Sequence, residues 1–470
     1  MNTSNFNSNI VLTAKQKIAW DALAAGKSVF LTGPAGTGKT ALIHKFNKKS
    51  RKRVSLTSST GTSALLMGGS TLHSYLGIGL GDGCVDWYVD KIVKKKWLSK
   101  RWRQIDVLVI DEISMISPEL FDVLNAVAQR VRKSRAPWGG IQLLLSGDFM
   151  QLPVVKSEKF TFEASTWNES IDKTVVLDEN VRQSGDTVYR DILQRCRTGD
   201  HTADDIERLN KQVGADVSKN GITPTMLYST NASVDIKNED GLMDQAEANL
   251  GPDADESGEL ELWDYEMRCT TLDPKCPQYK IEKAVKNCIA PSKFSLCPGA
   301  QVMLLVNMFE GEGDDRRLVL SNGSRGVVMK ILSDDNGRTP VVKFMNGEIR
   351  DIEEQTYEIK NDKKEVDIIL TQVPLRLAYA ITIHKSQGLT LDCAEIDISN
   401  CFTDGQAYVA LSRVKSLEGL SLKNRVGDGD IRAAPACIRY YKVQSGKVVE
   451  VEEEKGEEKG EGKKAKRLFL

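Results

Sequence analysis

The stretch Gly33-Pro-Ala-Gly-Thr-Gly-Lys-Thr40 decides the fold of this chain. It lies between an apolar run at residues 28–32 and a helix-like segment at 41–46, so strand, glycine loop and helix follow one another as a phosphate-binding loop requires. The glycines let consecutive backbone N–H groups point at one phosphate, and the helix start adds the positive end of its dipole. We expect Lys39 to reach the β- and γ-phosphates of a nucleotide and Thr40 to bind Mg²⁺.

Length and composition predict an ordinary globular protein of several domains. The chain has 470 residues, of which 40 % are hydrophobic and 27 % are charged. It has no apolar run long enough to span a membrane, and residues 1–9 have neither the basic nor the apolar part of a signal peptide. The nine cysteines have no zinc-site spacing. We therefore expect reduced thiols in a soluble, intracellular protein.

The net charge of −1 does not reveal that the chain has two basic segments, at residues 45–53 and 91–103. Trp87, Trp97 and Trp102 lie in or beside the second segment. A cationic groove with aromatic faces binds a single strand of nucleic acid through phosphate contacts and base stacking. A solvated basic helix whose Trp side chains pack inward explains the same pattern, and the residues alone leave both interpretations open.

Acidic side chains follow a second apolar run, at residues 105–110. Because parallel strands end at one edge of a sheet, we expect Asp111 and Glu112 to face the phosphate loop. Asp111 is placed to hold Mg²⁺, and Glu112 to orient or deprotonate the attacking water. Another core strand lies within residues 139–153 and brings Gln151 to the same edge, either to sense the γ-phosphate or as a buried structural amide.

Polar residues gather at further strand ends. Thr60, Thr71 and His73 follow the short strand at 54–57 and are positioned to hold a phosphodiester backbone, although a lone histidine is more often structural. Asn231 ends another predicted strand. A second polar cluster lies in apolar surroundings and consists of Thr382, His384, Lys385, Ser386 and Gln387.

The order of patterns predicts two α/β domains with an insertion. Residues 12–170 form the first domain, and residues 171–309 and 371–445 form the second. Short strands separated by Asn-Gly turns predict a small antiparallel barrel at 310–370. The ends, residues 1–11 and the charged tail 446–470, are expected to be disordered.

Together these motifs resemble the petite-integration-frequency (Pif-type) DNA helicases, which belong to superfamily one, subclass B. The matching stretches occur in the family's order at residues 12–23, 33–40, 57–79, 111–116, 121–124, 137–140, 146–153, 179–183, 322–326, 381–388 and 408–414. Such a series is far more specific than the phosphate loop alone, which many unrelated proteins share.

The resemblance implies two RecA-like domains with parallel sheets and ATP in the cleft between them, an inserted barrel similar to an SH3 domain, and a strand-separating wedge at 80–104. It implies catalytic roles for Lys39, Asp111, Glu112 and Gln151, with Arg182 and Arg413 as arginine fingers, and Mg²⁺ on Thr40 and Asp111. The implied nucleotide contacts are Gln16 on adenine, then Gly33, Pro34, Ala35, Gly36, Thr37, Gly38, Lys39, Thr40 and Gly388. The implied DNA contacts are Thr60, Thr71, His73, Trp97, Asn231, Thr382, His384, Lys385 and Ser386.

The resemblance further implies an ATP-dependent helicase that moves 5′ to 3′ on single-stranded DNA and unwinds tailed duplexes, with RNA–DNA hybrids and G-quadruplexes as further substrates. We expect a monomeric motor in replication, repair, recombination or telomere maintenance, located in the nucleus of a eukaryote or the replication compartment of a virus. The alternatives are another superfamily-one motor, a nucleotide-gated DNA-binding protein or translocase that does not separate strands, and a small-molecule P-loop kinase.

Overall fold

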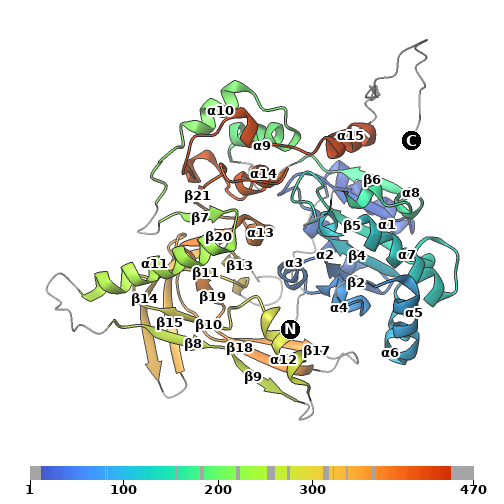
Figure 1. Ribbon diagram of the computed structural model, residues 1–470, viewed down its shortest axis with the longest axis horizontal. Coiled ribbons are helices and arrows are strands. Elements are labelled where there is room, and N and C mark those ends of the chain that lie inside the picture. The colour runs from blue at the N-terminus through green and yellow to red at the C-terminus, as the bar shows by residue number, and fades with distance from the viewer. Residues whose placement is uncertain are drawn as a thin grey trace, which may run out of the picture.

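The computed structural model describes residues 12–79, 81, 83–154, 157, 159–179, 185–218, 223–250, 260–272, 276–310, 317–320, 322–334, 337–360 and 366–445. The two ends predicted to be disordered, and the predicted arginine finger Arg182, lie outside these residues. Two parallel sheets and a group of antiparallel sheets make up the fold (Figure 1). All nine cysteines lie in the described residues, and none of them forms a disulfide.

The first sheet has six parallel strands in the order β3-β2-β4-β5-β1-β6. Its central strands read as continuous apolar runs because alternate residues are buried on opposite faces, one packed with α7 and the other with α1 and α2. The strands are β1 (Val29–Thr32), β2 (Val54–Ser58), β3 (Ser70–Thr71), β4 (Val107–Asp111), β5 (Gln142–Gly147) and β6 (Lys173–Val176). Its helices are α1 (Ala14–Ala24), α2 (Lys39–Lys49), α3 (Gly61–Leu66), α4 (Leu72–Leu76), α5 (Val85–Lys94), α6 (Lys96–Gln104), α7 (Pro118–Arg132) and α8 (Trp167–Ser170), with 3-10 turns η1 (Ile113–Met115), η2 (Pro137–Gly140) and η3 (Thr161–Glu163).

The second parallel sheet has four strands in the order β20-β7-β21-β22. Helices α9 and α14 lie together beside it, and the Tyr189 hydroxyl on α9 donates to the carbonyl oxygen of Leu411 on α14 (2.7 Å). The strands are β7 (Thr225–Tyr228), β20 (Ala380–Thr382), β21 (Ala394–Ile396) and β22 (Leu420–Leu422). The helices are α9 (Thr187–Thr198), α10 (Ala203–Asn210), α11 (Asn231–Leu250), α13 (Ile383–Ser386) and α14 (Gln406–Leu411), with η5 (Leu417–Gly419) and η6 (Asp428–Asp430).

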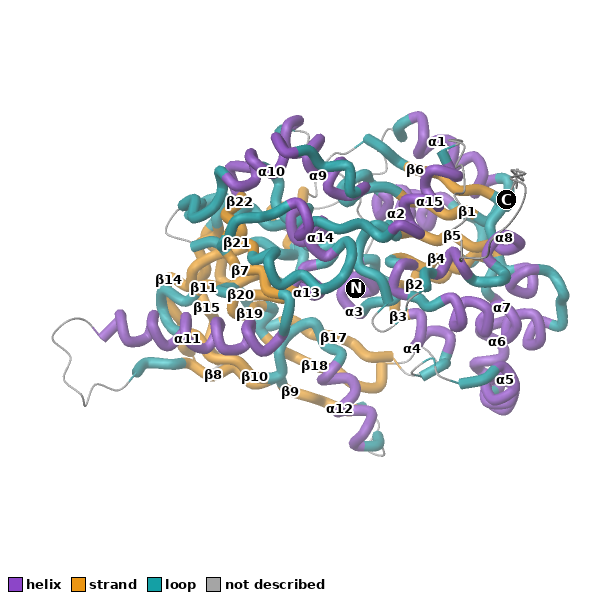
Figure 2. Tube along the Cα trace, turned by 45° about the horizontal axis from the view of Figure 1, so that its top comes forward, coloured by secondary structure: helices purple, strands orange, loops and turns teal. Residues whose placement is uncertain are grey.

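Antiparallel strands form the end of the molecule opposite α7 (Figure 2). They pair as β16-β15-β14-β11-β19, β17-β18-β9, β10-β8 and β12-β13, and no closed barrel is found among the pairings of the residues described above. The strands are β8 (Trp263–Glu266), β9 (Arg268–Thr271), β10 (Lys293–Leu296), β11 (Gln301–Leu304), β12 (Met308–Glu310), β13 (Arg317–Leu320), β14 (Arg325–Asp334), β15 (Gly337–Phe344), β16 (Ile349–Asp351), β17 (Gln355–Lys360), β18 (Val366–Gln372) and β19 (Leu375–Leu377), and α12 (Gln278–Lys286) packs against β18.

The predicted domain limits differ from the sheets in three respects. Strand β6 pairs with β1, so the first sheet continues past residue 170. Strands β9, β11 and β19 lie outside 310–370 yet share sheets with strands of the predicted insertion. Helix α15 (Pro435–Gln444), placed in the second domain by the sequence, returns to the first, where Cys437 is buried in the core of that domain (Figure 1).

Candidate active site

The phosphate loop, residues 33–40, joins β1 to α2 as predicted. Gly33 and Gly38 have φ values of +139° and +80°, and a Cβ on Gly33 would lie 2.2 Å from the carbonyl oxygen of Leu177. Position 33 therefore requires glycine for two reasons. Residues with a side chain rarely adopt this backbone conformation, and the neighbouring backbone leaves no room for a Cβ. The Lys39 ammonium donates to the carbonyl oxygens of Gly33 (2.7 Å) and Pro34 (2.9 Å), so it lies folded over the loop.

Gln16 lies against the phosphate loop. Its backbone N–H donates to the Thr13 hydroxyl (3.3 Å) and its side-chain oxygen accepts from the Thr13 N–H (3.1 Å), a capping box that starts α1. Its Nε2 also donates to the carbonyl oxygen of Thr37 (3.3 Å). Gln16 is thus buried between the cap and the loop, rather than being a free surface glutamine.

Asp111 and Glu112 stand at the end of β4, facing the loop. The Ser63 hydroxyl donates to Asp111 Oδ2 (2.8 Å) and fixes that carboxylate. Glu112 has a left-handed backbone with φ of +52°, and its carbonyl oxygen accepts from the Ser59 hydroxyl (2.8 Å). Non-glycine residues adopt this conformation at a cost, and such residues cluster at functional sites.

The electrostatics of this pair suit proton transfer. Burial, and next the negative charge of Asp111, raise the pKa of Glu112 to about 7. The positive charges of Lys39 and Arg413 and a hydrogen bond from Gln387 act in the opposite direction. A carboxylate whose pKa lies near neutral pH is suited to take a proton from water.

The pKa of Lys39 is affected by burial and by neighbouring charges in the opposite directions. Burial lowers the pKa of Lys39, while the negative charges of Asp148, Glu112 and Asp111 raise it. The carboxylates that surround the loop therefore favour the charged ammonium that a phosphate needs.

Thr40 and Asp111 fit the ligand preference of Mg²⁺. A hydroxyl and a carboxylate are hard oxygen donors, and Mg²⁺ is usually held by one or two carboxylates together with substrate phosphates and water. Among the described residues no group of three or more His, Cys, Asp or Glu side chains forms a metal cage. A divalent cation here would therefore depend on the nucleotide for its remaining ligands.

Gln151 and Gln387 meet across the two domains. Gln387 Nε2 donates to Glu112 Oε2 (3.0 Å) and to Gln151 Oε1 (3.3 Å). The sequence placed Gln387 in the polar cluster at 382–387 but assigned it no role. Its place in that cluster, directly before Gly388, is the signal that could have found it, and Gly388 has φ of +83°.

The second arginine, Arg413, is buried beside these groups. Its Nε donates to the carbonyl oxygen of Val409 (2.8 Å), and its Nη1 donates to those of Ser386 (3.4 Å) and Leu389 (3.3 Å). Its guanidinium is close enough to Glu112 to lower the pKa of that carboxyl. Arg413 thus approaches Glu112 from the side of the second domain, and its role as an arginine finger stays a prediction.

Three of the predicted DNA-contact threonines cap short helices at strand ends. Thr60 Oγ1 accepts from the Ser63 N–H (3.3 Å) at the start of α3, and Thr71 Oγ1 accepts from the Ser74 N–H (3.4 Å) at the start of α4. Thr382 Oγ1 accepts from the Lys385 N–H (3.1 Å) at the start of α13. These helix starts lie on both domains, and the N–H groups at a helix start are of the kind that bind phosphate.

The other predicted DNA residues differ in exposure. Lys385 is exposed, His73 and His384 are half-buried, and burial lowers the pKa of both histidines. Ser386 is fully buried and its hydroxyl donates to the carbonyl oxygen of Ile383 (2.7 Å), so it supports the turn. Asn231 begins α11, and its side chain is outside the described part.

The aromatic residues of α5 and α6 divide between core and surface. Tyr88 and Trp102 are fully buried, and Trp102 Nε1 donates to the carbonyl oxygen of Leu76 (3.1 Å). Trp97, predicted to contact DNA, is half-buried against the first core, with the Arg101 guanidinium 4.9 Å from its ring. Trp87 is 51 % exposed, with Lys91 Nζ 4.5 Å above its ring. The inward-packing interpretation therefore applies to Trp102, and Trp87 is the exposed aromatic surface.

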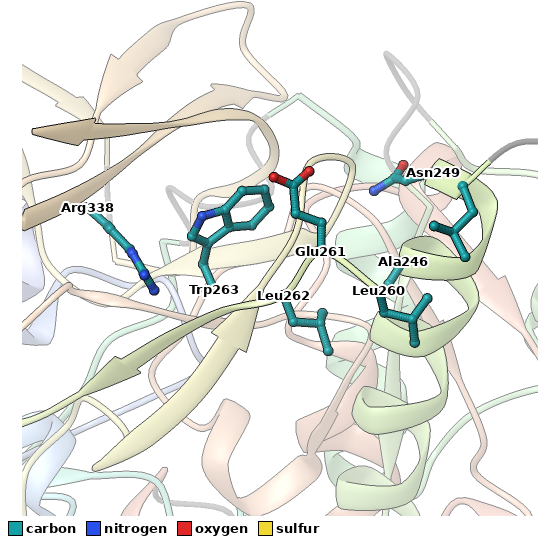
Figure 3. Close-up of a pocket in the computed structure, with 8 residues that line it drawn as sticks. Ala246, Asn249, Leu260, Glu261, Leu262, Trp263 and Arg338 are labelled. Carbon is teal, nitrogen blue, oxygen red and sulfur yellow. The ribbon is translucent and has the colours of Figure 1, made fainter. Parts of the chain in front are cut away.

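A separate hollow of about 420 Å³ lies beside the C-terminal half of α11 (Figure 3). Its lining comes from α11, from the segment 260–263 and from β15. It contains none of the predicted site residues and is unrelated to the phosphate loop.

No helix in the described ranges is both long enough and apolar enough to cross a membrane.

Known proteins resemble this chain over nearly its whole length. The family model "PIF1-like helicase" matches residues 11–204. The ATP-dependent DNA helicase Pif1 of Bdellovibrio bacteriovorus is 35 % identical over 440 residues, covering 92 % of both chains. The ATP-dependent DNA helicase PIF1 of Xenopus laevis is 36 % identical over 448 residues, and the chain spans 65 % of that protein.

Solved structures of Pif1 proteins are also similar to the structure of this chain. Bacteroides sp Pif1 in complex with ADP-AlF4 has a TM-score of 0.75 at 27 % identity, covering 93 % of this chain and 98 % of that one. The same Bacteroides protein bound to ssDNA has a TM-score of 0.61. The likeness therefore extends over both parallel sheets, and the resemblance to the family seen in the motifs is confirmed. This chain belongs to the PIF1-like helicase family, the family of ATP-dependent DNA helicases.

Proposed function

We propose that this helicase uses ATP hydrolysis to move 5′ to 3′ along single-stranded DNA and to displace the paired strand. The observation that carries the proposal is the Gln387 amide, which touches both Glu112 and Gln151. Gln387 follows the Thr382–Ser386 turn, which belongs to the proposed DNA surface, so one short segment reaches both sites. The 5′-to-3′ direction is inferred from family membership alone.

The proposed residue roles combine the geometry of the described residues with the family resemblance, which alone supports Arg182, a residue outside the described part. Lys39 and the N–H groups of the phosphate loop bind the β- and γ-phosphates, and Gln16 lies beside the loop where adenine would be recognised. Glu112 takes the proton of the attacking water, and Gln151 contacts the γ-phosphate. Arg413 neutralises charge that develops there, with Arg182 as the second arginine finger. Bound Mg²⁺, held by Thr40 and Asp111, would supply further charge neutralisation.

Movement follows from two domains that share one γ-phosphate. Bound ATP would hold the closed arrangement in which Gln387 contacts Glu112 and Gln151 and Arg413 lies beside them, and hydrolysis removes the γ-phosphate that holds the domains together. Each domain has its own helix starts for phosphate, at Thr60 and Thr71 on one side and at Thr382 on the other. Alternating closure and opening then changes which domain holds the strand, and the strand advances.

Strand separation is proposed for α5 and α6. Trp87 and the basic residues around Lys91 provide the exposed aromatic and cationic surface that a displaced base can stack on. Trp97 contributes through Arg101, whose guanidinium lies on its ring.

We further propose that the motor acts as a monomer. RNA–DNA hybrids and G-quadruplexes are proposed to be among its substrates, in replication, repair, recombination or telomere maintenance.

The deciding experiment compares ATP-dependent unwinding of two matched duplexes, one with a 5′ single-stranded tail and one with a 3′ tail. We expect unwinding of the 5′-tailed duplex alone, and none with Lys39→Ala. A preference for the 3′ tail would refute the direction. DNA-stimulated hydrolysis without unwinding of either duplex would instead favour a translocase that does not separate strands.

A further inference from the structure

A buried ion pair joins the two domains next to the reacting groups. Asp148, directly after β5, is 1 % exposed. Arg197 on α9 donates to both of its carboxylate oxygens, Nε to Oδ2 and Nη2 to Oδ1, each at 2.8 Å. This two-point geometry fixes the relative orientation of the groups as well as their distance. Because α9 packs in the core of the second domain, the pair crosses from one domain to the other.

The hydroxyl of Tyr441, on the returning helix α15, completes this network. It donates to Asp148 Oδ1 (3.2 Å) and accepts from the Phe149 N–H (3.2 Å). The Thr32 hydroxyl lies 2.6 Å away and must donate to it, since the single phenolic proton is already used. The Arg197 guanidinium lies 4.9 Å from the Tyr441 ring. One hydroxyl therefore links the last residue before the phosphate loop to Asp148.

The same helix and the second domain hold the segment that carries Gln151, residues 148–152, which we call the sensor loop. Asp148 Oδ1 accepts from the Met150 N–H (3.2 Å), and the Asp148 carbonyl oxygen accepts from the Gln151 N–H (3.0 Å). The Cys437 thiol on α15 donates to the carbonyl oxygen of Phe149 (3.2 Å).

The second domain also touches the sensor loop directly. Leu152 is buried in the core cluster of the second domain, whereas Phe149 and Met150 are buried in that of the first. A Cβ on Gly405, at the start of α14, would lie 2.5 Å from the carbonyl oxygen of Met150. The sensor loop is thus held between the domains, and any shift of one domain against the other must be transmitted to it.

We propose that Arg197 and Tyr441 are positioning residues for ATP hydrolysis, which hold Asp148 and through it keep Gln151 at the cleft. The proposal rests on the function given above, in which Gln151 contacts the γ-phosphate. It gives α15 a role that the sequence did not suggest, since this helix connects the end of the second domain to the site of the first. The charge of Asp148 is also the largest of those that raise the pKa of Lys39.

Tyr441→Phe is the sharpest test, because it removes one hydroxyl and keeps the ring that lies on Arg197. Truncating Arg197 would leave the Asp148 charge buried without a partner, and that alone destabilises a protein strongly. Tyr440→Phe is the matched control: it is the same substitution one residue earlier in α15, on a ring that stacks on Phe162 with centroids 4.3 Å apart.

The first measurement is hydrogen exchange of peptides that cover the sensor loop, which needs no activity. We expect Tyr441→Phe to speed exchange of the Phe149, Met150 and Gln151 amides by about tenfold or more, since an opening free energy lower by 1.4 kcal/mol corresponds to tenfold. Tyr440→Phe should leave it unchanged. Unchanged exchange in Tyr441→Phe would overturn the proposal.

The second measurement is a double-mutant cycle on DNA-stimulated ATP turnover with Gln151→Ala. We expect Tyr441→Phe alone to lower kcat by about tenfold with little change in KM, because small displacements of reacting groups are costly. In the Gln151→Ala background its further effect should be under about twofold. Equal losses in both backgrounds would show that Tyr441 acts without Gln151 and would overturn the positioning role. A wild-type protein without DNA-stimulated turnover would refute the proposed function instead, while hydrogen exchange still reports on the loop.

Discussion

At the scale of single residues, Glu112 combines three features that rarely coincide in a structural carboxylate. Its backbone lies in the left-handed region, its pKa is raised to about 7 and its side chain accepts a hydrogen bond from the other domain. Asp111, its neighbour in sequence, is instead held by Ser63 within the first domain. This difference in environment supports the separate roles proposed for them, Glu112 in proton transfer and Asp111 in holding the cation.

Glu112→Gln tests that division. The amide keeps the shape of the side chain but cannot take a proton, so we expect kcat for ATP turnover to fall by about 10²- to 10⁴-fold while ATP binding persists. Phosphate release and binding of a fluorescent ATP analogue measure the two properties separately. Glu119→Gln, at an exposed position on α7, is the control and should behave as wild type. Normal turnover in Glu112→Gln would exclude it as the base.

At the scale of elements, α10 depends on one buried carboxylate. Asp205 Oδ2 accepts from the Thr202 N–H (2.9 Å), and the Thr202 hydroxyl accepts from the Asp205 N–H (3.2 Å), which closes a capping box. Arg195 on α9 donates to both Asp205 oxygens, at 2.6 and 2.5 Å. The hydrogen bonds from Arg195, and next those from Thr202, lower the pKa of Asp205 to about 2.

This pKa predicts how the stability of the second domain depends on pH. Because the folded pKa lies below the unfolded value, the stabilisation is present at neutral pH and is lost as the pH falls from about 4 to about 2. Asp205→Asn should lower the free energy of unfolding by about 1–2 kcal/mol at pH 7, a value reduced for the solvent exposure of Arg195. Urea denaturation of both proteins at several pH values measures the difference, which should shrink in acid.

The neighbouring carboxylate provides the control for this experiment. Asp204 pairs with Arg208 one turn later, and both side chains are largely exposed. Such a pair contributes little in water, so Asp204→Asn should change stability by less than about 0.5 kcal/mol at any pH. A loss as large as that of Asp205→Asn would show that general charge effects, rather than the cap, stabilise α10.

At the scale of the whole molecule, Gln387 provides a direct contact between the hydrolytic groups and the proposed DNA surface. Gln387→Leu keeps the size of the side chain and removes its N–H donors. We expect the ratio of DNA-stimulated to DNA-free ATP turnover to fall by about fivefold or more, the lower end of a typical coupling between sites. Phosphate release with and without an oligonucleotide measures this ratio, and fluorescence anisotropy checks that DNA still binds. An unchanged ratio would mean that DNA acts on hydrolysis through other contacts.

Much of the first domain follows from local rules. Strand, glycine loop and helix at residues 28–46 can be recognised without any distant partner, because the backbone conformation of the loop itself requires glycine. The capping box of α1 and the position of the carboxylates after β4 are likewise set by residues close in sequence. The parallel sheet then brings strand ends to one edge, so neighbours in the site could be named from the sequence.

The contacts that join the domains were decided only by the tertiary structure. Gln387 meets Glu112 over a separation of 275 residues, and Tyr441 meets Asp148 over 293. The polar cluster at 382–387 marked Gln387 without naming its partners, and no local pattern marked Tyr441, because these contacts depend on how two separately folded cores pack together. The same holds for Trp87 and Trp102. Their spacing is compatible with either burial or exposure, because burial depends on which neighbouring element covers each face of the helix. Local sequence thus determined the ATP-binding chemistry, whereas packing between the domains determined how that chemistry is connected to the rest of the molecule.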